Sequence, residues 1–184
     1  METQMTKQNH LETLIVISLI ILGVSLRIIP HPDNFAPVAA IAIFGGALLP
    51  RRLAVAAPLG AMAISDAIIG FHSLIVVTWS CYALMALTSY LWLKRRGILR
   101  VAVMTLSGSL FFFVVTNLAV WIVSGMYSHN FSGLVRCFVL ALPFFRNTLL
   151  SDAGYTSSLF GLYFLAMWLG ERWKPILTPK QTQS

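Results

Sequence analysis

Long apolar runs separated by short polar breaks fill most of the chain between Leu11 and Leu169. An α-helix needs about 20 predominantly apolar residues to cross the hydrocarbon core of a bilayer, which is about 30 Å thick. The runs therefore predict an all-α fold, an integral membrane bundle of about six transmembrane helices. The expected helices cover residues 11–28, 36–49, 53–69, 73–93, 101–124 and 148–169.

Two segments depart from a simple series of crossings. The run at 36–49 is short for a full span. Residues 133–145 are also apolar, but this segment is short, contains Arg136 and is broken near its end by Pro143. Such a length is typical of a helix that lies at the membrane interface or re-enters from one side. We therefore expect 133–145 to form a short interfacial or re-entrant helix and not a crossing.

Composition points to the same class of protein. The chain is 58% hydrophobic and 10% charged, and its mean hydropathy is +0.80, whereas a soluble domain carries about 25% charged residues. We expect one transmembrane domain at 11–170, between tails at 1–10 and 171–184. The pI of about 9.9 could indicate nucleic acid as a partner. Because the basic residues lie in short clusters beside the apolar runs, we expect the lipid bilayer as a partner and no nucleic acid.

Six crossings divide the basic residues unevenly between the two sides of the membrane. The side that carries both termini holds ten of the thirteen Lys and Arg residues, and the opposite side holds Arg27, Arg136 and Arg146. The ten are Lys7, Arg51, Arg52, Lys94, Arg95, Arg96, Arg100, Arg172, Lys174 and Lys180. Since short loops rich in Lys and Arg stay inside the cell, this bias predicts that both termini are cytoplasmic.

The sharpest local signal is the stretch RIIPHPDNFAP at residues 27–37. Its three prolines prevent a continuous helix and stiffen the connection between the first two helices. One interpretation is a rigid turn with no further role. The other is a turn that covers a pocket and presents Arg27, His31 and Asn34 to a ligand.

Three polar residues fall inside predicted helices, towards the ends opposite the basic clusters. Asp66 lies about one turn from the end of its helix, Asn117 lies deeper, and Asp152 lies near the start of the last helix. An ionised carboxylate in such a place costs several kcal/mol unless it faces protein, water or a cation. Two compatible interpretations stay open. Asp66 or Asp152 pairs with an arginine on that side and locks the bundle, or some of these residues bind a ligand.

The sequence carries no motif for chemistry on a substrate. There is no glycine-rich phosphate loop, no GxSxG, no HExxH and no pair of histidines three or four residues apart. We therefore expect no metal, no cofactor and no enzymatic activity. An intramembrane enzyme using His31, Asp66 or Asp152 is a less favoured alternative. The candidate ligand-binding residues are Arg27, His31, Asn34, Asp66, Asn117, Trp121, Arg146, Asn147, Asp152 and Tyr155.

Small residues recur at helical spacing in two neighbouring segments. One set is Ala39, Ala42 and Gly46, and the second set is Ala54, Ala57, Ala61 and Ser65. Such stripes allow helices to approach closely in lipid. We expect them to pack within the chain, with docking of a membrane partner as the alternative.

Four stretches carry a resemblance to a known group of proteins: RIIPHPDNFAPVAAIAIFGGALLPRR, APLGAMAISDAIIGFH, TNLAVW and ALPFFRNTLLSDAGY. Over about residues 27–161 the chain resembles an uncharacterised family of small six-helix bacterial membrane proteins. That family is in turn similar to the substrate-binding (S) components of energy-coupling factor (ECF) transporters. The resemblance implies a multi-pass protein of the bacterial cytoplasmic (inner) membrane that binds a micronutrient or vitamin-like molecule at its outer face. It also implies an ECF T component and ATPase subunits as partners.

These observations lead to two hypotheses of different kinds. The first is a membrane-embedded small-molecule-binding subunit of an ECF-type uptake transporter. The alternative is a structural or assembly subunit of a membrane complex, in which the polar residues form an internal ion-pair network.

Overall fold

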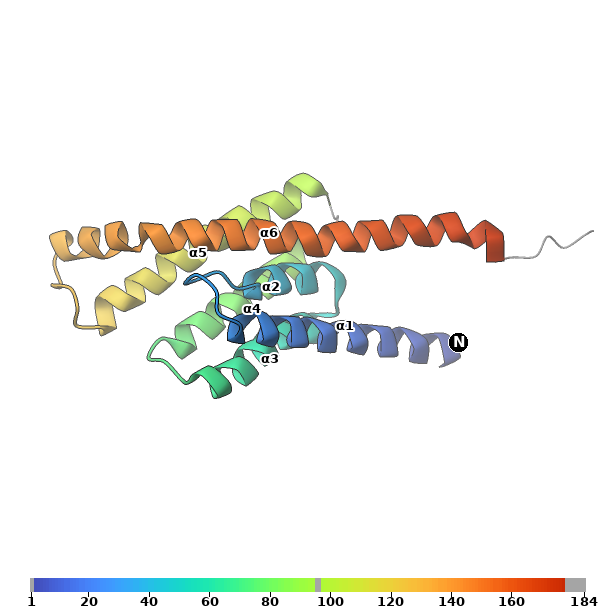
Figure 1. Cartoon of the computed structure of the whole chain (residues 1–184), viewed down its shortest axis with the longest axis horizontal. Helices are drawn as coiled ribbons and strands as arrows, with labels where there is room; N and C mark the ends of the chain where they lie inside the picture. The colour runs from blue at the N-terminus through green and yellow to red at the C-terminus, as the bar shows by residue number, and fades with distance from the viewer. Residues whose placement is uncertain (1, 95–96, 178–184) are drawn as a thin grey trace, which may run out of the picture.

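The protein is described here by a computed structural model covering residues 2–94 and 97–177. Within these ranges the fold is entirely helical, which confirms the predicted all-α class. The helices are α1 (Glu2–Ile28), α2 (Val38–Leu48), α3 (Arg51–Ile69), α4 (Ile75–Trp92), α5 (Ile98–Val123) and α6 (Phe131–Leu177). Five of them are long and apolar enough to cross a membrane, and α2 is the shorter exception. Figure 1 shows the helices running roughly along the long axis of the molecule.

Helix α2 forms the centre of the bundle. Its 11 residues span about 16 Å at about 1.5 Å per residue, which is about half of the hydrocarbon core. Every residue from Val38 to Ala47 is buried, and α2 contacts all five other helices. A helix that is hydrophobic on all sides belongs in the interior of a protein or in lipid. The predicted helix at 36–49 therefore exists, but it is too short to cross the membrane alone and is instead enclosed by the longer helices.

The small-residue stripes pack within the chain, as expected. The alanines of both stripes are at most 4% exposed. Gly46 of α2 shows why small residues are needed, because a Cβ at this position would lie 2.6 Å from the carbonyl oxygen of Ala86 in α4. Gly23 of α1 is similarly crowded, since a Cβ there would lie 2.7 Å from the Cβ of Ala61 in α3. Both distances are shorter than van der Waals contact, so these helix pairs depend on glycine for their close approach.

Helix α6 differs from the prediction. Residues 133–145 do not form a separate interfacial or re-entrant helix, because they belong to one helix that runs from Phe131 to Leu177 through Pro143. Its 47 residues measure about 70 Å, more than twice the thickness of the hydrocarbon core. A proline removes one backbone hydrogen bond, but neighbouring helices can hold the two halves in line. Here α2 and α5 both contact α6. The prediction was wrong because the length of an apolar run does not set the length of a helix.

Helix α1 also extends beyond its predicted range. It begins at Glu2 and not near residue 11, so the segment predicted as a tail at 1–10 is largely helical. That segment contains Glu, Gln, Met and Lys, which all favour helix, and its polarity ends the apolar run without ending the helix. At the other terminus α6 continues to Leu177, and residues 178–184 of the predicted tail at 171–184 lie outside the described residues.

The two ends of the bundle differ in composition. One end, here called the basic end, carries the start of α1 and the end of α6 (Figure 1). The α2–α3 connection, followed by Arg51 and Arg52, and the α4–α5 connection, preceded by Lys94, are at the same end. The opposite end, here called the polar end, holds the α1–α2, α3–α4 and α5–α6 connections. The chain therefore separates the basic clusters from the candidate ligand-binding residues near the other connections.

The α1–α2 loop is fixed to α6 at the polar end. The side-chain amide of Asn147 donates a hydrogen bond to the carbonyl oxygen of Asp33 at 3.0 Å. The hydroxyl of Ser151 donates another to the carbonyl oxygen of Ala36, also at 3.0 Å. Asn34 takes a left-handed backbone conformation with φ of 60°, which asparagine adopts more readily than most residues. The predicted turn is thus a structured element, and α6 holds it over the helix ends.

Candidate functional site

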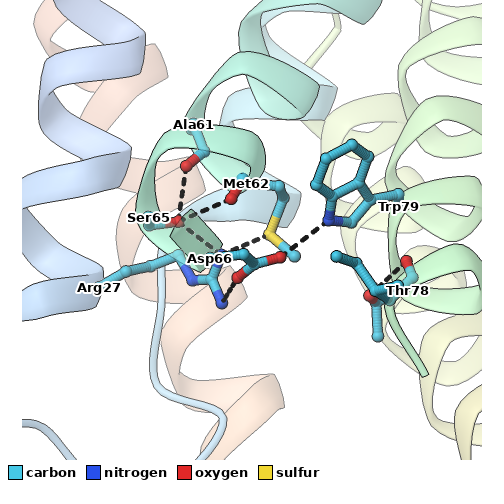
Figure 2. A network of polar contacts seen from close by, with 8 residues as sticks. Arg27, Ala61, Met62, Ser65, Asp66, Thr78 and Trp79 are labelled. Atoms are coloured by element: carbon cyan, nitrogen blue, oxygen red, sulfur yellow. Dashed lines mark hydrogen bonds and ion pairs between the residues drawn. The ribbon is translucent and has the colours of Figure 1, made fainter. Parts of the chain in front are cut away.

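Arg27, in the last turn of α1, forms an ion pair inside the bundle. Its Nη2 lies 2.8 Å from Oδ1 of Asp66 in α3, and the two side chains are 16% and 1% exposed. Figure 2 shows the guanidinium reaching from α1 to α3. Nη1 of the same guanidinium donates a hydrogen bond of 2.7 Å to the hydroxyl of Ser65. Each charge would be costly alone in an apolar bundle, and the pairing offsets that cost.

The Asp66 carboxylate has a second partner across the α3–α4 connection. The indole N–H of Trp79 in α4 donates to Oδ2 of Asp66 at 2.8 Å (Figure 2). Arg27 and Trp79 therefore occupy different oxygens of the same carboxylate. We call Arg27, Ser65, Asp66 and Trp79 the ion-pair cluster. It confirms the interpretation that Asp66 pairs with an arginine and joins helices of the bundle.

A second carboxylate is buried without a cation. Asp152 of α6 is 3% exposed, and its Oδ2 accepts a hydrogen bond of 2.6 Å from the hydroxyl of Ser109 in α5. Across the described part of the chain, no basic side chain lies within ion-pair distance of Asp152. A neutral hydroxyl does not cancel the charge of a carboxylate. Asp152 therefore differs from Asp66, whose charge is matched by an arginine.

Asp152 lines a cavity at the polar end of the bundle. The cavity has a volume of about 220 Å³, and all six helices or the loops between them contribute to its wall. Both polar and apolar side chains contribute to it. The wall consists of Arg27, His31, Asn34, Ala36, Val38, Ala39, Met62, His72, Thr78, Tyr82, Phe112, Thr148 and Asp152.

A wider and more open depression adjoins this cavity. Its volume is about 500 Å³, and its wall includes Asn117 and Tyr127 together with apolar residues of α5 and α6. The residues common to both spaces are His31, Asn34, His72, Thr78 and Phe112. This shared wall makes the depression a continuation of the cavity towards the surface at the polar end.

One wall of the cavity is aromatic. The rings of Tyr82 in α4 and Phe112 in α5 are stacked, with centroids 5.1 Å apart and an interplanar angle of 25°. Thr78 lies one helical turn before Tyr82, so both side chains project from the same face of α4. The cavity therefore combines aromatic surface, hydroxyl groups and the Asp152 carboxylate within a small volume.

Half of the predicted ligand-binding residues line these two spaces. Arg27, His31, Asn34 and Asp152 are in the wall of the cavity. Asn117 lines the adjoining depression, and its amide donates a hydrogen bond of 2.7 Å to a carbonyl oxygen one turn earlier in α5. The proline-rich loop and the polar residues of α5 and α6 thus meet at the polar end, as the sequence suggested.

The other five predicted residues lie outside both walls. Asp66 belongs to the ion-pair cluster. Asn147 holds the α1–α2 loop, and the ring of Tyr155 contacts that loop edge-on at a centroid distance of 5.8 Å. Trp121 donates a hydrogen bond of 3.0 Å to the α5–α6 connection. Arg146 is exposed. These residues therefore support the site or lie away from it.

Sequence reasoning missed several wall residues, namely His72, Thr78, Tyr82, Phe112 and Thr148. One usable signal was the four-residue spacing of Thr78 and Tyr82, which places two hydroxyl groups on one face of an otherwise apolar helix. Phe112 and Thr148 carry no such signal, because Phe111 and Phe113 flank the first and another threonine, Thr156, occurs in the same helix as the second.

The described residues contain no group of three or more His, Cys, Asp or Glu side chains that could hold a metal ion. What the cavity offers is hydrogen-bonding groups, one uncompensated carboxylate and aromatic surface. Such a set can bind and orient a small polar molecule.

The chain matches no curated protein and no solved structure. A family model does match: DUF6580, described as a family of unknown function, covers residues 7–175. That range includes the ion-pair cluster, the cavity and the adjoining depression. The chain belongs to the DUF6580 family.

Proposed function

We propose that this protein is a membrane-embedded binding subunit for a small molecule, which occupies the cavity at the polar end. The observation that carries the proposal is the cavity of about 220 Å³ in a largely apolar bundle, with a buried carboxylate, a guanidinium and hydroxyl groups in its wall. Ionisable residues inside membrane proteins are expensive and usually mark a ligand or ion pathway.

The size of the cavity limits the ligand. Pockets for drug-sized molecules measure about 300–1,000 Å³, and this cavity of about 220 Å³ lies below that range. The adjoining depression of about 500 Å³ gives room for approach or for an additional part of the ligand. A small metabolite or vitamin-like compound fits these dimensions better than a peptide or a lipid.

The basic residues and the cavity lie at opposite ends of the bundle, and this arrangement supports a role in uptake. We propose that the basic end faces the cytoplasm of a bacterial cell, because Arg51, Arg52 and Lys94 lie there together with both ends of the helical chain. The cavity then opens outward. Since the sequence has no phosphate-binding loop of its own, energy for uptake comes from partners. The resemblance to S components favours an ECF T component and its ATPase subunits.

Binding can be tested by native mass spectrometry of the purified protein. We expect a small molecule to be retained by the wild type and lost from Asp152→Asn. Thr156→Val is the matched control, because Thr156 is on the same helix, one turn away, 3% exposed and outside the cavity wall. It should retain the molecule. A wild-type protein that binds nothing from its source cells, under conditions in which it stays folded, contradicts the proposal.

The coupling partners need a separate test. Gentle solubilisation of the source membranes, followed by affinity purification of the tagged chain, should recover an integral T component and ATPase subunits. If the small molecule is retained but no ATPase is recovered, the binding function remains and the ECF-type coupling is wrong.

The ion-pair cluster favours a second candidate, a structural or assembly subunit of a membrane complex. In this cluster Asp66 pairs with Arg27 and accepts a hydrogen bond from Trp79, so the carboxylate has partners within the chain, as in an internal ion-pair network. This candidate predicts a chain that is stable only together with a partner and that retains no small molecule. The experiments above therefore distinguish the two functions.

A further inference from the structure

We infer that the cavity selects an organic cation, a small molecule with a protonated amine or a quaternary ammonium group held by Asp152 against the Tyr82–Phe112 wall. The inference rests on the proposed function, and it names the class of ligand. It follows from the charges, the hydrogen bonds and the aromatic surface of the cavity.

The charges of the wall leave one negative charge without a partner. Among the described residues Arg27 is the only Lys or Arg in the wall of the cavity, and its charge is already paired with Asp66 at 2.8 Å. The two wall histidines, His31 and His72, are exposed and belong to the loops at the mouth. Asp152 is left as the buried carboxylate for which the described part of the chain provides no cation. A cationic group in the cavity would supply the missing charge.

The Asp152 carboxylate also accepts fewer hydrogen bonds than it could. The Ser109 hydroxyl has a single proton, and two acceptors lie within reach of it: Oδ2 of Asp152 at 2.6 Å and the carbonyl oxygen of Thr105 at 3.0 Å. A carboxylate has room for about four hydrogen bonds. In the ion-pair cluster, by contrast, Oδ2 of Asp66 accepts from the Trp79 indole, and Oδ1 lies against the Arg27 guanidinium as an ion pair, so that the negative charge has a cation beside it. The Asp152 carboxylate therefore keeps acceptor capacity for a donor outside the chain, such as an ammonium group.

The aromatic wall distinguishes an organic cation from a metal ion. Tyr82 and Phe112 are both wall residues and stack on one another at 5.1 Å. Aromatic faces attract alkylammonium groups through the ring quadrupole and also bury their methyl or methylene groups. Hard metal ions instead require several oxygen ligands, and no cluster of three acidic, histidine or cysteine side chains is found among the described residues.

The test uses polar metabolites extracted from the source cells and separated by ion exchange into cationic, neutral and anionic pools. Each pool is added at matched ionic strength to the full-length protein in detergent, and the thermal midpoint of unfolding is measured. A ligand that binds only the folded state raises this midpoint. We expect the cationic pool to raise it for the wild type and for the control Thr156→Val, and to have no effect on Asp152→Asn.

A defined pair of probes sharpens the result. Choline chloride and its uncharged isostere 3,3-dimethyl-1-butanol have the same shape and differ in charge, so a larger midpoint shift with choline isolates the contribution of the cation. For whichever cation in the active pool binds best, Asp152→Asn should weaken the apparent affinity by about 30-fold or more, as loss of a buried charge partner does. Phe112→Leu should weaken it by about 3-fold or more through the lost cation–π contact.

The outcomes separate this inference from the proposed function. Stabilisation by the neutral or the anionic pool alone, or a cationic ligand that binds Asp152→Asn as well as the wild type, overturns the inference and leaves the binding function in place. If no pool stabilises the protein, both the inference and the proposed function are wrong.

Discussion

Two buried carboxylates in this protein, Asp66 and Asp152, have partners of different kinds. Asp66 lies between Arg27 of α1 and Trp79 of α4, so that its charge is paired with a guanidinium and its Oδ2 accepts a hydrogen bond within the chain. Asp152 has a comparable burial, 3% against 1% exposed, but its partner is the neutral hydroxyl of Ser109. The fold thus supplies a cation for Asp66, whereas Asp152 faces a cavity.

The difference shows how the same residue type takes a structural or a binding role. A buried ion pair is costly to break, because removal of one partner leaves an uncompensated charge in an apolar environment. An unpaired carboxylate beside a cavity lowers the stability of the fold until a ligand pairs with it. A role in ligand binding therefore explains its presence better than a role in stability does. The comparison therefore makes predictions that differ in size and in sign for the two sites.

The largest effect is expected for Arg27→Met, which removes the cation and leaves Asp66 buried without it. We expect the free energy of unfolding to fall by about 3–5 kcal/mol, the range for a broken buried ion pair. It is measured by denaturant titration in detergent micelles. Arg136→Met, at an exposed position of α6, is the control and should change stability little. The double variant Arg27→Met/Asp66→Asn should lose less than Arg27→Met alone. A loss equal to the sum of the losses of Arg27→Met and Asp66→Asn would mean that the two side chains do not interact.

A smaller loss is expected for Trp79→Phe, which removes the indole donor to Asp66 and keeps an aromatic ring. Because a hydrogen bond to a charged group is lost, stability should fall by about 1.5–3 kcal/mol in the same titration. Trp121→Phe removes a hydrogen bond to a backbone carbonyl oxygen and should cost about 0.5–1.5 kcal/mol. If Trp79→Phe costs no more than Trp121→Phe, the indole contributes nothing special to the Asp66 carboxylate.

At the second carboxylate we expect Ser109→Ala to cost about 1 kcal/mol, because a single neutral donor is removed. The loss should be measurable as a lower thermal midpoint of the ligand-free protein. Ser158→Ala, on α6 at an exposed position, is the comparison and should have an effect close to zero. A loss as large as that of Arg27→Met would show that Ser109 supports the fold in a way that its one contact to Asp152 does not explain.

The smallest effect is expected for Asp152→Asn in the absence of ligand. The asparagine oxygen still accepts from Ser109, while the uncompensated charge disappears, so stability should change by no more than about 0.5 kcal/mol or should rise. The same variant should nevertheless lose ligand retention. A strong destabilisation of Asp152→Asn would place Asp152 with Asp66 as a structural residue and end the contrast between the two sites.

Part of the candidate site could be predicted from local sequence. Three prolines within a few residues interrupt the helices wherever the rest of the chain goes, so the loop that carries His31 and Asn34 was recognisable. An aspartate inside an apolar run is unusual enough to stand out by itself, which identified Asp66 and Asp152. The sequence could not assign their roles, because the partner of Asp66 comes from α1, 39 positions earlier, and the wall of the cavity comes from every helix.

The sequence by itself determined the all-helical class, the approximate positions of the first five apolar helices and the placing of the basic clusters away from the polar residues. These properties follow from hydrophobic runs and local backbone preferences, which need no tertiary contact. Only the tertiary structure decided that the other helices enclose α2 and that residues 133–145 are part of α6. It also decided that Arg27 pairs with Asp66, whereas Asp152 lines the cavity. The reason is physical: burial, helix continuation through a proline and charge pairing each depend on which helices lie side by side, and that arrangement is a property of the whole packed bundle.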